Sequence, residues 1–505
     1  MNIWHLNKIK YISNLLGIFV FLSVSGCSSE EGTETQSTAV EVHEEFYTEN
    51  SYSGTKSCLS CHEDVGDDVL KTAHWNWQGL ATNITGQENE LHGKNDLINN
   101  FCIAIPSNEG RCTQCHIGYN YKDKTYDFNN AENIDCLVCH DQTSTYKKAK
   151  TTAGVPEPTV DLLSVAKSVG KNKGVPQRVN CIGCHANAGG GDNVKHGDLS
   201  SALTNTTREF DVHMGTDGGN FTCVACHDVK RTHAGEQLDH GIGGMPFHTI
   251  DEGTMKQCSD SGCHGDNNTA HAAKDLGGLF VTPGSSTQRH QRLACQVCHI
   301  PTIARQIATT TSWDWSTAGQ NIDPIPVDPV TGRPTYDKKK GTFIWEKNVR
   351  PILRVHNGKW NKLVINVNDQ FTTTPVMMAE PEADPNDQSA MIYPFKRIVG
   401  KQIADANNKT MLVPHLFGLA GGSNPYWAKY DWNLALEDAA AYTGQTYSGA
   451  FEFVDTEMLL SVNHEVAPAV MTLGKDGKCA DCHGASQINW SSLGWQSDPH
   501  PMGGN

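Results

Sequence analysis

The sequence predicts a mainly α-helical protein with extensive loops, and a smaller β-containing segment in the second half of the chain. Three observations lead to this fold class. The 505 residues include 18 cysteines, only 38% of the residues are hydrophobic, and most cysteines form pairs with a histidine directly after the second. Side chains of this composition would build a small core for so long a chain. A non-protein component is therefore expected to fill much of the interior.

The charge balance restricts the partners. There are 40 Lys and Arg against 56 Asp and Glu, which gives a formal net charge of −16. Binding to a phosphate backbone needs clustered positive charge, so nucleic acid is excluded as a partner. An anionic substrate would need local positive charge around its site.

Residues 1–27 are predicted to be a lipoprotein-type signal segment. Lys8 and Lys10 precede an apolar run that is short for a membrane span, and Val24-Ser25-Gly26-Cys27 resembles a bacterial lipobox. Cys27 would carry the lipid, and residues 28–50, rich in Ser, Thr and Glu, would be a flexible tether. The expected location is the periplasmic side of the outer membrane, with the lipid as the single membrane contact. If Cys27 is not lipidated, the protein would be soluble in the periplasm.

The paired cysteines follow one pattern. Cys58-Leu-Ser-Cys61-His62 is the first of seven CxxCH motifs, whereas a shuffled sequence of this composition would contain about 0.03. An eighth motif has a longer spacing, from Cys258 to Cys263 and His264. The sixteen cysteines of the eight motifs are Cys58, Cys61, Cys112, Cys115, Cys136, Cys139, Cys181, Cys184, Cys223, Cys226, Cys258, Cys263, Cys295, Cys298, Cys479 and Cys482.

This spacing predicts eight covalently attached c-type haems. Two thiols three residues apart reach the two vinyl groups of one haem, and the following imidazole is placed to bind the iron. Disulfides would not need the histidine, and zinc sites would pair two CxxC units without repeating it. With Cys27 lipidated, Cys102 is the one cysteine left over. The motif histidines expected as axial ligands are His62, His140, His185, His227, His264, His299 and His483.

The motif spacing also predicts the organisation of the chain. Residues 51–300 would be one haem-packed body with seven haems, 301–478 a haem-free segment that packs on the array, and 479–505 the eighth haem and C-terminus. Within these parts the local patterns predict helices at 160–169, 431–442 and 457–471, and strands at 343–346 and 362–368 with a hairpin turn at Asn357-Gly358.

A closed electron-transfer haem needs a second histidine. The histidines nearest the motifs are the predicted second ligands: His74, His196, His213, His233, His271, His290 and His464. Substitutes for any of them are His92, His240 and His248. Four others are predicted not to be ligands: His43, His356, His415 and His500.

Eight motifs with a long haem-free stretch before the last resemble the octahaem tetrathionate reductase family. The segments 189–198 (GGGDNVKHGD), 295–301 (CQVCHIP) and 313–319 (WDWSTAG) agree with it. The resemblance spans about residues 55 to 490 and implies that the second haem is the active site. It assigns Lys195 as the iron ligand in place of His116, with Asp192 and Cys102 lining the pocket.

The residues themselves are compatible with these roles. A lysine amine binds iron only after losing its proton, which a metal can drive. Asp192 beside an open iron face could supply protons or hold a polar substrate. An unpaired Cys102 in an oxidising compartment is either part of a site or a buried, inert thiol.

The implied activity is that of a respiratory multihaem oxidoreductase. It would reduce tetrathionate to thiosulfate, or nitrite and hydroxylamine to ammonium, with electrons from a redox donor protein or a quinol-linked cytochrome; a homo-oligomer is compatible with the sequence. Two alternatives stay open. One is a non-catalytic electron conduit with two strong ligands on each iron. The other is a hydroxylamine or hydrazine oxidoreductase, against which the lysine motif argues.

Overall fold

The computed structural model of the chain describes residues 38–233, 236–244, 255–265, 292–387, 389–475, 478–484 and 488–498. All of them belong to one compact unit. The predicted signal segment with Cys27, and His248, His271, His290 and His500, lie outside the described residues. Within the described residues, no helix is long and apolar enough to cross a membrane.

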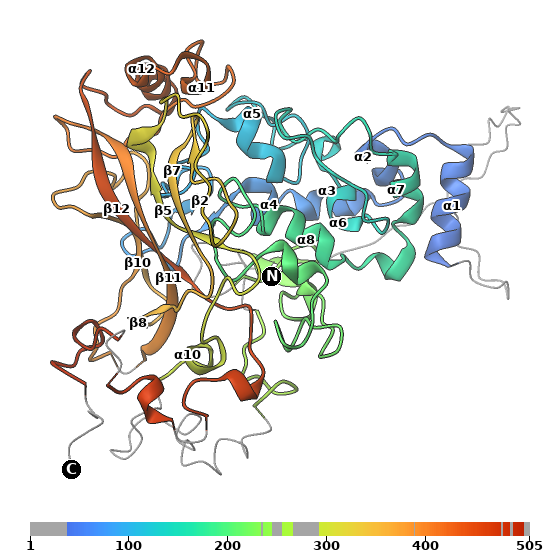
Figure 1. The fold of residues 1–505 in the computed structure, drawn as a ribbon. Helices are drawn as coiled ribbons and strands as arrows, with labels where there is room; N and C mark the ends of the chain where they lie inside the picture. The colour runs from blue at the N-terminus through green and yellow to red at the C-terminus, as the bar shows by residue number, and fades with distance from the viewer. Residues whose placement is uncertain are drawn as a thin grey trace, which may run out of the picture. The chain divides into compact units, whose positions relative to one another are not determined.

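A mixed sheet, eight-stranded within the described residues, shows that the predicted mainly α fold class is wrong (Figure 1). Its order is β6-β7-β5-β11-β12-β10-β9, and β8 pairs with β11 beside β5. The pairs β5·β11 and β10·β12 are parallel, and the others are antiparallel. The strands are β5 Thr309–Asp314, β6 Tyr336–Asp337, β7 Gly341–Glu346, β8 Ile352–His356, β9 Trp360–Lys362, β10 Val376–Pro381, β11 Met391–Asp405 and β12 Phe451–Ser461.

The reason for the error is an uneven distribution of apolar residues. The main hydrophobic core gathers Trp313, Phe343, Phe395, Ile398 and Leu459 on the strands of this sheet. The average hydrophobic content is low, but the strands within residues 301–478 gather a side-chain core, to which Phe101 and Val194 also contribute. A whole-chain composition hides such a segment.

Local predictions in this segment had mixed outcomes. Helix α12, Trp432–Thr443, is confirmed; the Asp431 carboxylate accepts a hydrogen bond from the Leu434 amide at its N-terminus. The helix predicted at 457–471 is wrong, because residues up to Ser461 belong to β12 and the chain then forms a loop. Met458, Leu459 and Leu460 are all buried, and a strand covered on both faces lacks the alternation that distinguishes it from a helix.

The strand predicted at 343–346 is confirmed as part of β7. The hairpin predicted around Asn357-Gly358 is wrong, because β8 pairs with β11 while β9 pairs with β10. The strand predicted at 362–368 keeps only its first residue, Lys362, as the end of β9. These pairings join distant parts of the chain, which a local turn signal does not reveal.

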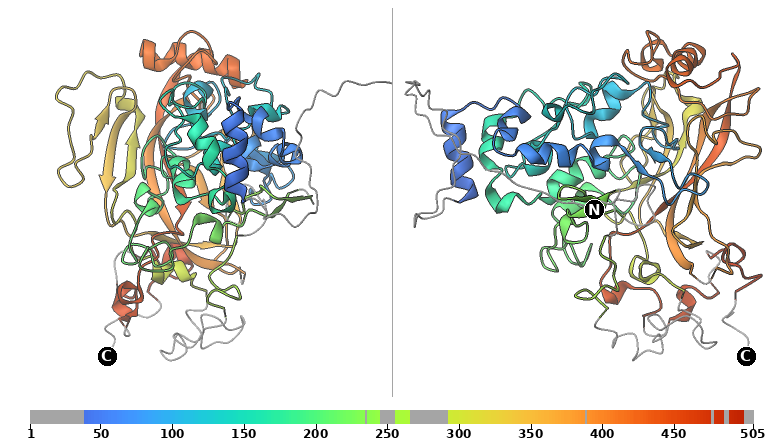
Figure 2. Two further views of the ribbon diagram at one scale, coloured as in Figure 1. Left: turned by 90° about the vertical axis from the view of Figure 1, so that its right-hand side faces the viewer. Right: turned by 180° about the vertical axis from the view of Figure 1, so that it is seen from behind.

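Short helices carry or flank most of the motifs, and Figures 1 and 2 show those of the first four to one side of the sheet. The helix predicted at 160–169 is confirmed as α7. The helices are α1 Ala39–Glu49, α2 Thr55–Leu59, α3 Glu63–Val69, α4 Ala73–Asn76, α5 Glu109–Cys112, α6 Leu137–His140, α7 Leu162–Ser168, α8 Arg178–His185, α10 Cys295–His299 and α11 Tyr426–Lys429. Two small sheets pair β1 Gln78–Leu80 with β2 Leu91–Gly93, and β3 Arg231–His233 with β4 Glu236–Leu238.

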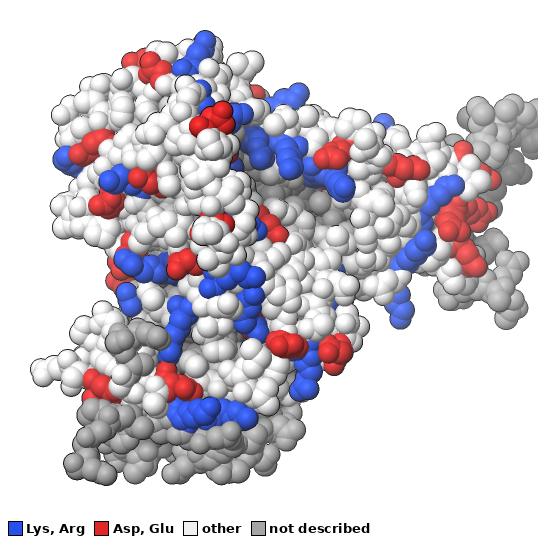
Figure 3. Space-filling view, in the orientation of Figure 1, with Lys and Arg blue, Asp and Glu red and all other residues white. Residues whose placement is uncertain are grey.

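Helix α1 corrects the predicted tether, which was to extend to residue 50. Thr38 and Glu41 form a capping box, in which each side chain bonds the other's backbone amide. Tyr47 of α1 packs in a small core with Leu137 and Val165. The acidic side chains of α1 gather on its surface at the right of Figure 3. The Glu-rich composition therefore reflects an exposed helix face rather than a disordered linker.

Candidate functional site

A cavity of about 450 Å³ lies where the second motif meets the sheet. Its wall includes both thiols of that motif, Cys112 and Cys115, together with Lys195 and Cys102. Residues at β9, β10 and β12 complete it, among them Trp360 and Met378. The volume falls in the range of roughly 300–1,000 Å³ that is usual for cofactor and ligand sites. Two thiols at one wall and apolar rings around them fit a covalently held macrocycle.

The second motif is anchored to the haem-free segment by its helix start. Asn108 directly precedes α5, and its side chain donates to the Pro414 carbonyl (3.0 Å) and accepts from the Leu416 amide (2.6 Å). These buried bonds hold α5, which ends at Cys112, against a loop 300 residues further along the chain. Long-range contacts of this kind set the cavity and are not readable from motif spacing.

His116 is not among the described residues that line the cavity. Its Nε2 lies 2.5 Å from the Trp75 carbonyl oxygen, and its ring contacts Trp75 and Trp77 with centroids 5.1 and 5.0 Å away. The residue is fully buried, and burial lowers its pKa to about 3. By contrast, His140 and His227 use Nδ1 to bond carbonyl oxygens, each at 2.8 Å. In His140 that arrangement leaves Nε2 for a metal, whereas in His116 the corresponding atom is occupied.

Lys195 lies in the wall that His116 does not reach. Within the described residues its ammonium makes no hydrogen bond or ion pair, and its Nζ is 5.9 Å from the centre of the Phe101 ring. Burial, with a smaller contribution from the Lys94 ammonium, lowers the pKa of Lys195 to about 8. A lysine with a lowered pKa releases its proton more readily, which is what metal binding requires.

The loop that carries Lys195 is held by a second, fully buried lysine. Lys396 of β11 donates from Nζ to the carbonyl oxygens of Val194 (2.6 Å) and Lys195 (2.9 Å) and to Thr309 Oγ1 (2.7 Å). All three ammonium protons are thus used. The central strand of the sheet therefore positions the backbone of Lys195, a role with no local sequence signal.

We expect Lys396→Met to lower the free energy of unfolding by about 2 kcal/mol, because two buried carbonyl oxygens lose their donor. Thermal unfolding followed by far-UV circular dichroism measures the change. The exposed Lys401 of the same strand, 3.7 Å from Asp455, is the matched control. Equal melting temperatures for Lys396→Met and Lys401→Met would contradict this role.

Asp192 and Cys102, the two predicted neighbours of Lys195, differ in their position relative to the cavity. The Asp192 carboxylate accepts from the Ser201 amide (2.9 Å) and hydroxyl (2.5 Å), and the described cavity wall does not include it. Cys102 does line the cavity, and burial raises the pKa of its thiol. A Cβ on Gly190 would lie 3.3 Å from the Cys102 sulfur, so the glycine loop packs directly against it. The structure thus corrects the position expected for Asp192.

Several motif histidines face another histidine across a gap of constant width. Two metal–nitrogen bonds of about 2 Å plus the two ring radii span about 6 Å, so each gap fits one metal ion. The distances between ring centroids are 6.2 Å for His62–His43, 6.3 Å for His140–His240, 6.1 Å for His185–His74, 6.4 Å for His227–His464 and 6.0 Å for His264–His213. These pairs could hold the irons of the first, third, fourth, fifth and sixth motifs.

His43 was predicted not to be a ligand, whereas the structure places it opposite His62. Its Nδ1 bonds the Ala39 carbonyl at 2.6 Å, which leaves Nε2 toward His62. The tether prediction gave no reason to expect this position of His43, because a histidine on a disordered linker has no fixed position. The capping-box sequence Thr38-x-x-Glu41 was the signal that could have revealed the helix.

We expect His43→Ala to convert one low-spin haem into a high-spin haem while all haems stay attached, because the thioether bonds are untouched. Electron paramagnetic resonance of the oxidised protein measures the change. His92→Ala is the control, since both ring nitrogens of His92 are already bonded, to Asp96 (2.8 Å) and Gln87 (3.1 Å). An unchanged spectrum in His43→Ala would refute the pairing.

The positions of the remaining histidines bear less directly on iron binding. His196 lines the cavity beside Lys195, and only the backbone of His233 is described. His415 bonds Asp438 through Nδ1 at 3.3 Å, and His356 packs against Trp360. The Nδ1 of His483 lies 2.8 Å from Asp498.

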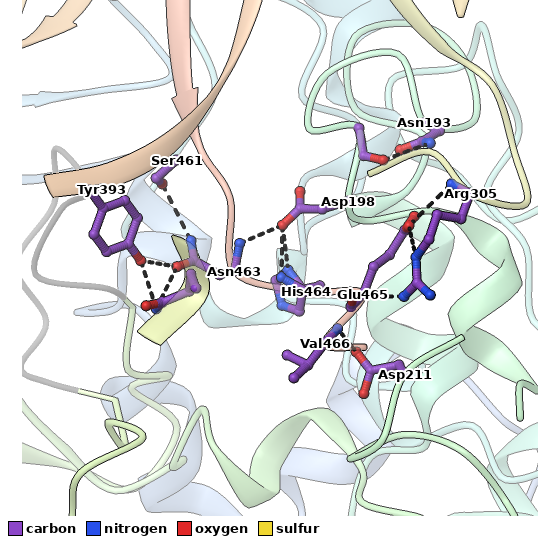
Figure 4. Close-up of polar contacts among 12 residues, drawn as sticks. Asn193, Asp198, Asp211, Arg305, Tyr393, Ser461, Asn463, His464, Glu465 and Val466 are labelled. Atoms are coloured by element: carbon purple, nitrogen blue, oxygen red, sulfur yellow. Dashed lines mark hydrogen bonds and ion pairs between the residues drawn. The ribbon is translucent and has the colours of Figure 1, made fainter. Parts of the chain in front are cut away.

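The His464 backbone is fixed by a buried polar network (Figure 4). Asp198 accepts from the amides of Asn463 (2.7 Å) and His464 (2.8 Å), and one of its oxygens lies 3.3 Å from His464 Nδ1. Arg305 binds the next residue, Glu465, through both its side chain and its carbonyl oxygen. The network places His464 opposite His227, although 237 residues separate the two.

Thiols of different motifs also meet. Cys115 and Cys184 are within hydrogen-bonding contact, and this contact lowers the pKa of Cys115 to about 6. The same contact links Cys58 to Cys136, Cys181 to Cys223 and Cys258 to Cys295. The motifs are therefore packed edge to edge: the first with the third, the fourth with the second and fifth, and the sixth with the seventh.

Repeated thiol pairs and facing imidazoles define a multihaem redox protein with covalently bound c-type haem. A family model described as "Cytochrome c bacterial" matches residues 310–486. The crystal structure of octahaem cytochrome c from Shewanella oneidensis is similar, with a TM-score of 0.74 and 36% identity over 90% of this chain and 94% of that one. An uncharacterised protein of Archaeoglobus fulgidus is 26% identical over 288 residues, which are 46% of this chain and 92% of the relative. The chain belongs to the octahaem cytochrome c family, which confirms the resemblance drawn from the motifs.

Proposed function

We propose that this chain is a respiratory reductase that carries eight haems and reduces a small inorganic substrate at the second motif. The substrates considered are tetrathionate, nitrite and hydroxylamine. Splitting tetrathionate into two thiosulfates takes two electrons and no protons, whereas reducing nitrite to ammonium takes six electrons and eight protons. A redox donor protein or a quinol-linked cytochrome would supply the electrons.

The observation that carries this proposal is the difference between the surroundings of His116 and those of Lys195. The Nε2 of His116 is bonded to the Trp75 carbonyl, while Lys195 faces the cavity that both motif thiols line. A haem bound there would supply an iron to which a substrate can bind. Lys195 would act as its neutral ligand, and the aromatic walls would restrict water.

Electrons would reach this site through the contacts between motifs. The second motif touches the fourth through Cys115 and Cys184, and the fourth touches the fifth through Cys181 and Cys223. The paired histidines at the fourth and fifth motifs, including His185 with His74, suit electron-transfer haems without an open position. The second motif would then lie at the end of a branch of the electron-transfer chain, which is where a site of substrate reduction is expected.

The proposal extends to location. The signal segment at residues 1–27 would direct the protein out of the cytoplasm, into the compartment where covalent haem attachment takes place. A lipid on Cys27 would hold it on the periplasmic side of the outer membrane.

The first test is reductant-driven turnover of the purified protein with a low-potential viologen dye, with tetrathionate, nitrite and hydroxylamine assayed in parallel. Rapid dye oxidation with any of them is the expected result, and the ranking identifies the physiological chemistry. Mass spectrometry of the same sample counts the haems. Failure to oxidise dye with all three substrates, in protein that carries eight haems, would favour the electron conduit instead.

A further inference from the structure

Three lysines on the wall of the main cavity have no counter-charge among the described residues. Lys94, Lys195 and Lys362 all line it, and within the described residues none of their ammonium groups forms a hydrogen bond or an ion pair. Arg111 and Lys340 add two more cations to the wall, but Lys340 pairs with Asp337 at 3.8 Å. Lys94 is exposed, whereas Lys362 is half-buried. No Asp or Glu is among the described residues that line this cavity. In a chain with a net charge of −16, this local excess of positive charge needs a physical reason.

Aromatic rings hold two of these ammonium groups in place without neutralising them. Lys94 Nζ lies 4.3 Å from the centre of the Trp77 ring, and Lys362 Nζ lies 4.5 Å from the centre of the Trp360 ring. Cation–π contacts of this kind orient a charge but leave it available to an anion.

The protonated amine of Lys195, before a metal displaces its proton, repels Lys94 and Lys362. Burial, with a smaller contribution from Lys195, lowers the pKa of Lys362 to about 7, and Lys94 contributes in the same direction to Lys195. An anion that enters the cavity would relieve this repulsion and raise the pKa of Lys362 again.

We infer that Lys94 and Lys362 hold the negative charge of the substrate beside Lys195, so that the cavity favours small inorganic anions over uncharged hydroxylamine. The inference rests on the proposed function, because it places substrate reduction in this cavity. It divides the three lysines by role: Lys195 faces the iron, whereas Lys94 and Lys362 determine specificity. It also gives this part of the wall the substrate-holding role that the sequence assigned to Asp192.

The test compares the complete, haem-loaded protein with its Lys94→Met and Lys362→Met variants. We expect each substitution to raise the KM for nitrite or tetrathionate about tenfold, as loss of one charged hydrogen bond should, and the double variant to raise it about a hundredfold. The KM for hydroxylamine should change less than about twofold, because the neutral molecule gains little from the charge. Lys362→Arg keeps the charge and should retain most of the affinity for anions.

The control is Lys401→Met, which removes one positive charge outside the cavity and should leave every KM unchanged. Nitrite binding to the oxidised protein, followed by haem absorbance, gives a dissociation constant that does not depend on turnover. Equal nitrite affinity in the parent and the double variant would overturn the inference, as would an equal loss of affinity for nitrite and hydroxylamine. A parent that reduces none of the substrates, but whose nitrite affinity falls in the variants, would refute the reductase function and retain the anion site.

Discussion

Lys195→Ala is expected to reduce substrate turnover to below about 1% of the parent value while every haem stays attached. Substitution of residues around a metal ligand often lowers activity 10- to 100-fold, and removal of the ligand itself should exceed this. The haem of the second motif would remain bound, because its thioether bonds are to Cys112 and Cys115. Turnover with the viologen dye and haem content by mass spectrometry are measured on the same preparation.

Two comparisons make this result specific. Lys401→Ala removes an exposed lysine that lies 3.7 Å from Asp455, and it should retain full activity. The absorbance spectrum of Lys195→Ala should change at a single haem, whereas a folding defect would affect several. Full activity in Lys195→Ala would exclude the lysine-ligated site and return His116 to the role of iron ligand.

Arg305→Met is expected to lower the free energy of unfolding by about 3–5 kcal/mol, the usual range for breaking a buried ion pair from one side. The Arg305 side chain is 9% exposed and that of Glu465 is 0% exposed. The guanidinium also donates to the carbonyl oxygens of Glu209, Phe210 and Glu465, so the substitution leaves several buried acceptors without a donor. Thermal unfolding measures the effect.

An exposed pair provides the control for this prediction. Lys409 lies 2.6 Å from Glu452, and the two side chains are 52% and 36% exposed. Lys409→Met should therefore lower the free energy of unfolding by less than about 1 kcal/mol. Similar losses in the two variants would show that the Arg305 network does not stabilise the fold as its burial implies. Because Arg305 holds Glu465, Arg305→Met should also disturb the neighbouring His464, which faces His227 of the fifth motif.

Helix α1 lies in the segment that was predicted to be a flexible tether. Its charged composition favoured a tether, and His43 was consequently excluded as a ligand. The capping pair Thr38 and Glu41 was present in the sequence, but a short amphipathic helix is stable only when its apolar face finds a partner. That partner is the small core of Leu137 and Val165, which lie about 90 or more residues further along the chain.

The sheet shows the same limit on a larger scale. Residues 391–405 and 451–461 pair over eleven positions, and β10, 70 or more residues earlier in the chain than β12, pairs with it in parallel. Neither strand pairing can be recognised from the local sequence, since pairing depends on which apolar faces meet after the chain folds. Composition averaged over the chain therefore gave the wrong fold class.

The sequence by itself determined the covalent chemistry. Haem attachment needs two thiols and an imidazole within five to seven residues, so the chain records it locally, and the family resemblance followed from the same motifs. Lys195 and Cys102 were likewise found in the GGGDNVKHGD segment and in the cysteine count. The tertiary structure alone decided which histidines face each other, that His116 turns toward Trp75, and that Lys94 and Lys362 meet Lys195 in one cavity. These relations join residues tens to hundreds of positions apart, and they depend on packing and burial, which act on the folded chain.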